Sequence, residues 1–221
     1  MPPGLVFLSA ARGYDLVPVP ASPCASDTTP LALAGVPTPI VVEQTTPAGA
    51  LVSVPLPTAT DDCSTPVVTG NAPAIFPPGT TTVTFTAVDA AGNTAHATTT
   101  VTVVDRTAPS ITALAAAPAV LSPANHTMVA VRVSATAADA ADPAPRCWID
   151  SVASSEPTDG RGDGRTATDW QITGDLTVSL RAERAGGGSG RVYTLAVVCA
   201  DHAGNRALGV GRVSVPHDKG R

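Results

Sequence analysis

The stretch Asp89-Ala90-Ala91-Gly92-Asn93 decides the fold, because it returns 112 positions later as Asp201-His202-Ala203-Gly204-Asn205. Each copy lies between two runs rich in β-branched residues, which favour strands. An aspartate that opens a turn accepts a hydrogen bond from its own backbone, and the glycine is free to take a positive φ. The recurrence of one turn in the same context predicts two copies of one kind of β module.

The composition suits short strands joined by rigid turns. Hydrophobic residues make up 43% of the 221 residues but aromatic residues only 3%, so the core must consist of aliphatic side chains and threonine methyls. The 22 prolines and 19 glycines mark frequent turns, and strands that alternate with turns about every 8–12 residues are typical of sandwiches. We therefore predict an all-β chain of two tandem Ig-like β-sandwich domains.

Charge and hydropathy exclude two classes of partner. The net charge is −5 and lysine and arginine form no large cluster, so we expect no nucleic-acid binding. No apolar run approaches the roughly 20 residues of a membrane span. Residues 5–11 are apolar, but no basic region precedes them and no cleavage site follows, so we expect no signal peptide there. The chain is expected to be part of a longer exported protein, or to lack its true start.

Turn residues divide the chain into three parts. Residues 1–27 are rich in proline and predict an extended leader or the end of a preceding segment. Residues 28–105 form the first predicted domain. Residues 106–221 form the second, with an insertion rich in aspartate and glycine at residues 157–169. The glycine-rich residues 185–190 are predicted to be a hairpin loop between the strand-like runs on either side.

Residues 37–105 resemble the hyalin-repeat (HYR) module. The resemblance rests on the stretches PAGA at 47–50, ATDD at 59–62, FPPGTTTV at 76–83 and AVDAAGN at 87–93. These modules often have cysteine at the position of Phe85, so their usual bridge is missing here. Phe85 alternates with Val83 and Ala87, and we expect all three to share the buried face of a strand.

Residues 109–218 resemble an Ig-like module found at the end of bacterial exported proteins. The matching stretches are SPANHTMV at 122–129, SEP at 155–157, GDG at 162–164, DW at 169–170, LRAER at 180–184, GRVY at 190–193 and VPHD at 215–218. Together the two resemblances imply an extracellular, non-enzymatic chain, secreted or on the cell surface. They imply no particular ligand.

The four cysteines are expected to pair rather than to bind metal. No two of them form a C-x-x-C pair, and their spacing fits no zinc site. Cys147 and Cys199 lie in strand-like segments 52 residues apart, which predicts a bridge between facing sheets. Cys63 has Cys24 as its remaining partner. The alternative for this second pair is two free or differently paired thiols.

Two groups of acidic residues are candidate calcium ligands, because this ion prefers carboxylate and carbonyl oxygens on loops. In an Ig-like topology, the loop after the second strand and the loop before the last strand lie at one end. The first group therefore comprises Asp105, Asp139, Asp142, Asp201 and Asn205, where the modules are expected to meet. The second comprises Glu156, Asp159, Asp163 and Asp169 of the insertion. The alternatives are turn-forming aspartates for the first group and a solvated loop for the second.

Catalytic signatures are weak. His96, His126, His202 and His217 are scattered, and neither G-x-S-x-G nor H-E-x-x-H occurs. The tripeptide Arg161-Gly162-Asp163 matches an integrin-binding motif, but it is common by chance in glycine-rich loops. We therefore predict a non-enzymatic spacer or adhesion tandem that positions the neighbouring domains of a longer chain, with an extracellular protein or polysaccharide as partner. The alternative is a polysaccharide-binding accessory module of an exported hydrolase.

Overall fold

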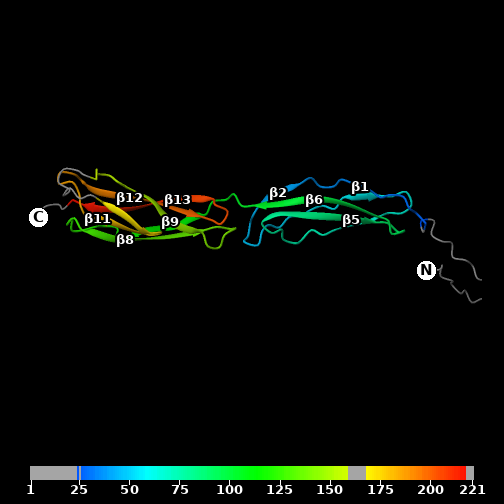
Figure 1. Ribbon diagram of the computed structural model, residues 1–221, viewed down its shortest axis with the longest axis horizontal. Coiled ribbons are helices and arrows are strands. Elements are labelled where there is room, and N and C mark those ends of the chain that lie inside the picture. The colour runs from blue at the N-terminus through cyan, green and yellow to red at the C-terminus, as the bar shows by residue number, and fades with distance from the viewer. Residues whose placement is uncertain (1–23, 25, 159–167, 218–221) are drawn as a thin grey trace, which may run out of the picture. The chain divides into compact units, whose positions relative to one another are not determined.

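The computed structural model describes Cys24, residues 26–158 and residues 168–217, which divide into two compact units. Unit 1 comprises the described residues up to Val42 together with Ala50–Val104. Unit 2 comprises Glu43–Gly49 and the described residues from Asp105 onwards. All regular structure in these ranges is β-strand (Figure 1), which confirms the predicted all-β fold of two Ig-like sandwiches.

In the part of the chain that the structure describes, no helix is long and apolar enough to cross a membrane. The predicted leader at residues 1–27 lies outside the described residues except for Cys24, Ser26 and Asp27.

Unit 1 is built around one long hairpin. Its described strands are β1 (Ala32–Ala34), β2 (Ile40–Glu43), β3 (Thr58–Thr60), β4 (Val67–Gly70), β5 (Gly79–Val88) and β6 (Thr94–Val104). β5 and β6 pair from Gly79 opposite Val103 to Val88 opposite Thr94, and the repeated turn connects them. They form the centre of a sheet with the order β2-β6-β5-β4, and β1 pairs with β3 in a second, smaller sheet.

The core of unit 1 follows from the alternation along β5. Val83, Phe85 and Ala87 are fully buried, whereas the threonines between them face the other side of the sheet. The core cluster consists of Ala50, Phe76, Val83, Phe85, Val101 and Val103. The predicted placement of Phe85 on a buried face with Val83 and Ala87 is therefore confirmed.

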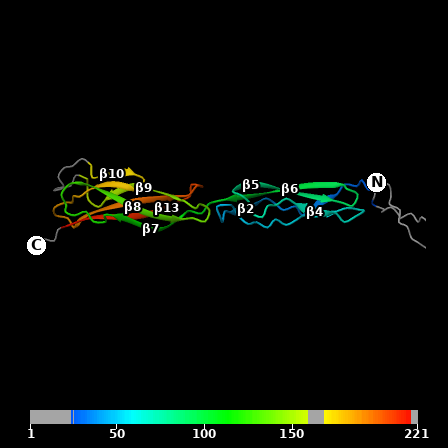
Figure 2. The same cartoon turned by 90° about the horizontal axis from the view of Figure 1, so that it is seen from below.

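Unit 2 contains two sheets with seven strands between Asp105 and His217 in the described ranges. The strands are β7 (Ser110–Ala117), β8 (Met128–Ala138), β9 (Arg146–Ser154), β10 (Trp170–Gly174), β11 (Thr177–Arg181), β12 (Gly190–Ala200) and β13 (Arg206–Pro216). One sheet has the order β10-β11-β8-β7 and the other β13-β12-β9. Figure 2 shows strands of both sheets, with β7, β8, β9, β10 and β13 labelled. The second copy of the repeated turn connects β12 and β13.

The central strand β12 contributes Tyr193, Leu195 and Val197 to the core between the two sheets. Its residues alternate strictly between buried and half-buried positions, so Tyr193, Leu195 and Val197 all point into the core. From the opposite sheet, Val131 and Val133 of β8 and Val178 and Leu180 of β11 pack against them.

The prediction of a hairpin loop at residues 185–190 is wrong. β11 and β12 belong to different sheets, so the chain between them crosses from one sheet to the other. The reason is that both edges of β11 are already paired, with β8 and with β10. β12 is likewise paired on both edges, with β9 and β13.

Both predicted disulfides are formed, but one of them connects different elements from those expected. Cys24 and Cys63 are bonded with their Cα atoms 5.5 Å apart. Cys147 and Cys199 are bonded too, yet they are directly opposite each other in the β9–β12 pairing. The prediction of a bridge between facing sheets is therefore wrong: this bridge joins neighbouring strands of one sheet, because the segments that contain the cysteines pair edge to edge.

Replacing Phe85 by alanine is expected to lower the free energy of unfolding of unit 1 by about 3–5 kcal/mol, because the change leaves a cavity in a core with little aromatic bulk. Chemical denaturation of the full chain measures the effect. The control is Leu51→Ala, since Leu51 is 82% exposed. Equal stability of the two variants would contradict the described packing of Phe85.

Replacing both Cys147 and Cys199 by alanine is expected to lower the stability of unit 2 by about 4 kcal/mol, because the bridge closes a loop of roughly 50 residues in the unfolded chain. Denaturation of the variant and of the oxidised wild type gives this difference. Peptide mapping of the oxidised protein provides the check, and free thiols at both positions would refute the pairing.

Candidate functional site

The repeated turn is held together by its own first and last residues. In unit 1, Asn93 donates its backbone N–H to Asp89 Oδ1 (2.8 Å) and its side-chain Nδ2 to Asp89 Oδ2 (2.8 Å). Gly92 has a φ of 92°, a conformation that favours glycine. Burial raises the pKa of Asp89, but the bonds from Asn93 outweigh this and hold the pKa below its usual value. The hydrogen bonds within the turn therefore account for the conformation of Asp89.

The same asparagine also fixes the point where the chain enters unit 1. Asn93 Nδ2 donates to the backbone oxygen of Asp27 at 3.0 Å. Asp27 Oδ1 in turn accepts from the backbone N–H of Thr29 at 2.8 Å. We call the bonds of this asparagine to the turn aspartate and to the entering chain the entry clamp.

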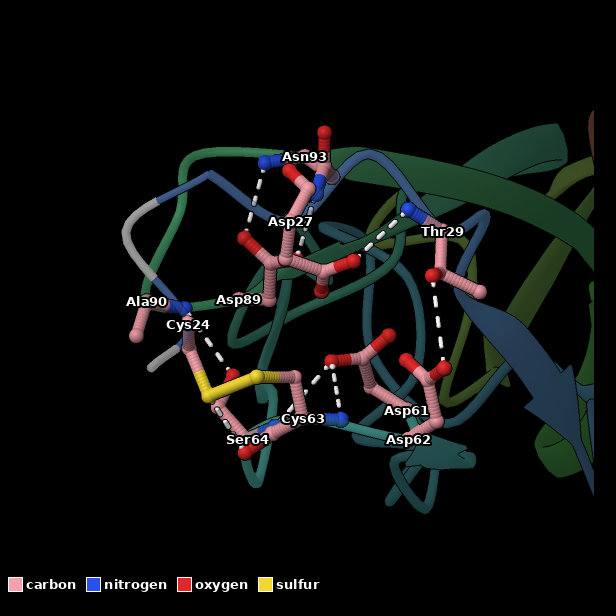
Figure 3. Close-up of a disulfide and its surroundings, with 10 residues drawn as sticks. All are labelled: Cys24, Asp27, Thr29, Asp61, Asp62, Cys63, Ser64, Asp89, Ala90 and Asn93. Atoms are coloured by element: carbon pink, nitrogen blue, oxygen red, sulfur yellow. Dashed lines mark hydrogen bonds between the residues drawn. A yellow bond between two sulfur atoms is a disulfide. The ribbon is translucent and has the colours of Figure 1, made fainter. Parts of the chain in front are cut away.

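A third aspartate joins this end of unit 1 from the loop after β3. Asp61 Oδ2 accepts from the backbone N–H groups of Cys63 (3.2 Å) and Ser64 (3.1 Å). The Cys24–Cys63 disulfide ties this loop to the entering chain (Figure 3). As a result, one carboxylate oxygen each from Asp27, Asp61 and Asp89 lies within 4.8 Å of the other two. We call these three residues the unit 1 acidic cluster.

Unit 2 repeats the entry clamp. Asn205 donates its N–H to Asp201 Oδ1 (2.8 Å) and its Nδ2 to Asp201 Oδ2 (2.9 Å). Its Nδ2 also reaches the backbone oxygen of Asp105 at 3.2 Å. Asp105 Oδ1 accepts from Thr107 N–H at 3.1 Å, as Asp27 does from Thr29.

The loop aspartate of unit 2 is Asp139, whose Oδ1 accepts from Ala141 N–H (2.7 Å) and Asp142 N–H (2.9 Å). Burial raises the pKa of Asp105, and the carboxylates of Asp201 and Asp139 raise it further. The structure thus brings together four members of the first predicted group, namely Asp105, Asp139, Asp201 and Asn205.

Asp142, the fifth member, has other partners. Its Oδ1 accepts from Ala144 N–H (2.9 Å), and its Oδ2 accepts from His202 N–H (2.9 Å) and lies 3.2 Å from His202 Nδ1. The bond from Ala144 lowers the pKa of Asp142, and the bonds from His202 add to this effect. Asp142 therefore connects the loop after β8 to the turn between β12 and β13.

The second predicted group lies around a buried arginine. Arg191 on β12 bonds Asp169 through Nη1 and lies 3.4 Å from Glu156 Oε2 through Nε. It is also 3.5 Å from Glu183 Oε1. Burial lowers the pKa of Arg191, but the bonds to Tyr193 and Asp169 outweigh this and raise the pKa above its ordinary value.

Two of the four predicted ligands in the insertion thus already have a cationic partner. Asp159, Asp163 and the Arg161-Gly162-Asp163 tripeptide lie outside the described residues. A calcium site in this loop stays a prediction.

The histidines have separate surroundings. His96 Nδ1 lies 3.1 Å from Thr86 Oγ1, and His126 Nδ1 lies 3.2 Å from Glu183 Oε2. His202 contacts Asp142, as described above, and His217 Nε2 lies 3.2 Å from the backbone oxygen of Gly186. Within the described ranges, the hydrogen bonds of the His96, His126 and His202 rings go to Thr86, Glu183 and Asp142.

Asp27 and Asp61 are not among the ligands predicted from the sequence. A signal was present, because Asp27-Thr28-Thr29-Pro30 and Asp105-Arg106-Thr107-Ala108-Pro109 both place a threonine two positions after the aspartate and then a proline. Asp61 follows Asp27 by 34 positions, and Asp139 follows Asp105 by the same 34. The repeat therefore includes the entering chain and the loop aspartate as well as the turn.

Residues 26–103 match the HYR domain family model, which confirms the resemblance of the first module. The resemblance of the second module to a bacterial Ig-like module stays a prediction. A comparison with curated proteins gives no match.

Several solved structures are similar to the chain at low identity. Human protocadherin-24 EC1-2, form II, is 15% identical, with a TM-score of 0.36 over 86% of this chain and 100% of that one. Fibronectin(III)-like modules of Clostridium thermocellum CbhA are 12% identical, with a TM-score of 0.28 over 86% and 99%. Titin domains I67–I69 are 9% identical, with a TM-score of 0.33 over 83% and 65%.

Replacing Arg191 by methionine is expected to destabilise unit 2 by about 3–5 kcal/mol, because it leaves buried carboxylates without their counter-charge. Urea denaturation of the full chain measures this loss. The matched control is Arg212→Met, since Arg212 is exposed on β13. Equal midpoints for the two variants would contradict a structural role of the buried arginine.

Proposed function

We propose that the chain is a non-catalytic extracellular tandem that spaces or attaches neighbouring domains of a longer protein, secreted or at the cell surface of a bacterium. The observation that supports this most is the entry clamp, which is built twice from matching residues. In each unit an asparagine side chain bonds both the turn aspartate and the backbone of the entering chain. Tension that enters a module is thereby passed directly to its central hairpin.

The two disulfides support an extracellular setting, because such bridges persist in oxidising compartments. They also limit how far a unit can extend. Cys24–Cys63 lies beside the entry clamp of unit 1, and Cys147–Cys199 joins two strands of unit 2 at the end where β12 turns into β13.

The polysaccharide-binding alternative has less support, because sugar rings are usually gripped by exposed aromatic side chains. Every aromatic residue in the described ranges is buried or half-buried: Phe76, Phe85, Trp148, Trp170 and Tyr193. Trp170 packs edge-on against Tyr193, with ring centroids 6.3 Å apart. The arginine side chain of Arg206 lies over the ring of Trp148. The described surface therefore offers no aromatic platform.

Calcium at the first predicted group is part of this proposal. Its support is the approach of Asp105, Asp139 and Asp201 within unit 2, together with the repulsion that raises the pKa of Asp105. Asp142 would act indirectly, since its carboxylate bonds Ala144 and His202. Such an ion would stiffen the end of unit 2 where the chain enters it.

A spacer is expected to hold a narrow distribution of distances between its two units. Spin labels on unnatural amino acids at Val67 and Leu208, both exposed, report this distance and leave the four cysteines bonded. Pulsed electron spin resonance of the full chain is expected to give one narrow peak. A distance distribution as broad as that of two units joined by a flexible linker would contradict the proposed spacer function. Retardation of the chain in gels containing cellulose, xylan or chitin would favour the accessory-module alternative instead.

A further inference from the structure

We infer that the unit 1 acidic cluster, Asp27, Asp61 and Asp89, is a calcium-binding site. One carboxylate oxygen of each residue lies within 4.8 Å of the other two (Figure 3). Two oxygens that bind the same Ca²⁺ at about 2.3–2.6 Å can lie up to about 5 Å apart. A single ion between the three side chains can therefore reach all of them. This site is separate from the group considered in unit 2, and it does not depend on the spacer function.

Two oxygens in the cluster are buried without any bonding partner. Asp27 Oδ2 and Asp61 Oδ1 each expose less than 1 Å² and accept no hydrogen bond from the described residues. The other oxygen of each carboxylate is held by backbone N–H groups, of Thr29 for Asp27 and of Cys63 and Ser64 for Asp61. Each of these two side chains is thus held in place through one oxygen, and its other oxygen is available to a cation. A shielded anionic oxygen with no partner is costly, and a bound cation removes that cost.

No side chain of the module can supply the missing positive charge. The chain has no lysine or arginine between Arg12 and Arg106, whereas residues 26–103 include five acidic residues. The single histidine of this range, His96, contacts Thr86 in the β5–β6 pairing. In unit 2 a buried cluster of carboxylates surrounds Arg191. Among the described residues the cluster in unit 1 has no such arginine, and a cation from solution supplies the counter-charge.

The donor set indicates a hard cation. All three side chains offer oxygen, and the nearby sulfur atoms of Cys24 and Cys63 are bonded to each other and cannot act as thiolate ligands. Oxygen-only ligands on loops suit Ca²⁺, which tolerates irregular geometry, whereas Zn²⁺ prefers nitrogen and sulfur. Asp27 and Asp61 lie three and two positions from the bridged cysteines. The disulfide therefore brings two of the three carboxylates together before the ion binds.

The test is calorimetric titration of the chelator-treated full chain with CaCl₂, with MgCl₂ as comparison. Binding is expected with a Kd of about 0.1–1 mM, the range of extracellular modules, and replacing one of three carboxylates is expected to weaken it at least about tenfold. The variant is Asp61→Asn, which keeps an oxygen for the N–H groups of Cys63 and Ser64. The matched control is Asp62→Asn, since Asp62 is exposed and outside the cluster. The variant Asp139→Asn distinguishes calcium binding by unit 2 from calcium binding by the unit 1 acidic cluster.

Thermal unfolding distinguishes an ion site from a merely structural cluster. In EDTA, Asp61→Asn is expected to melt at or above the temperature of the wild type, because it relieves repulsion between carboxylates. In millimolar calcium the wild type is expected to melt at the higher temperature, since only the wild type gains stability from the ion. The inference is overturned if Asp61→Asn and Asp62→Asn bind calcium alike, or if the calcium response disappears in Asp139→Asn alone. A titration without heat, together with a melting temperature that calcium does not change, overturns it as well.

Discussion

The hydrogen bonds of one asparagine side chain hold each module closed. Asn93 and Asn205 each satisfy both oxygens of the turn aspartate and also the backbone oxygen of the residue where the chain enters. Backbone groups that are shielded from water need such partners, because an unpaired one costs about as much as a lost hydrogen bond. The central hairpin and the entering segment meet at this amide.

The two units balance their buried acids by different means. In unit 2, Arg191 extends from the core strand β12 to Asp169 and Glu183, and it bonds Tyr193, whose hydroxyl donates in turn to the backbone of Arg181. This network is internal to unit 2. Unit 1 has acids and no basic partner among residues 26–103. The acids around Arg191 thus have an internal cation, whereas the acidic residues beside the two entry clamps are held by backbone N–H groups and asparagine.

The disulfides compensate for a core of small side chains. With 3% aromatic residues, each module buries few large groups, and Phe76 and Phe85 are the bulkiest members of the unit 1 core. Cross-links limit the unfolded chain and so stabilise the folded one without further buried area. Cys24–Cys63 has a second effect, since it fixes the entering chain against the loop of Asp61. Covalent and polar restraints thus coincide at the same end of unit 1.

Local patterns were enough to determine part of this protein. The repeated turn and the alternation of Val83, Phe85 and Ala87 follow from periodicity and spacing, because neighbouring residues in a strand face opposite sides whatever surrounds them. The spacing of Cys147 and Cys199 also indicated that they pair, but not that they lie in one sheet. The grouping of Asp105, Asp139, Asp201 and Asn205 also followed from the expected loop positions.

Only the tertiary structure decided which strands are neighbours and which charges meet. Cys147 and Cys199 are opposite each other in one sheet, and β11 and β12 lie in different sheets, because pairing depends on which edges are already occupied. Glu156 and Asp169 bond Arg191, 35 and 22 positions away, and no local pattern encodes such a distance. Asp27, Asp61 and Asp89 converge for the same reason: loop closure and a disulfide bring distant residues together, and sequence spacing alone does not specify that geometry.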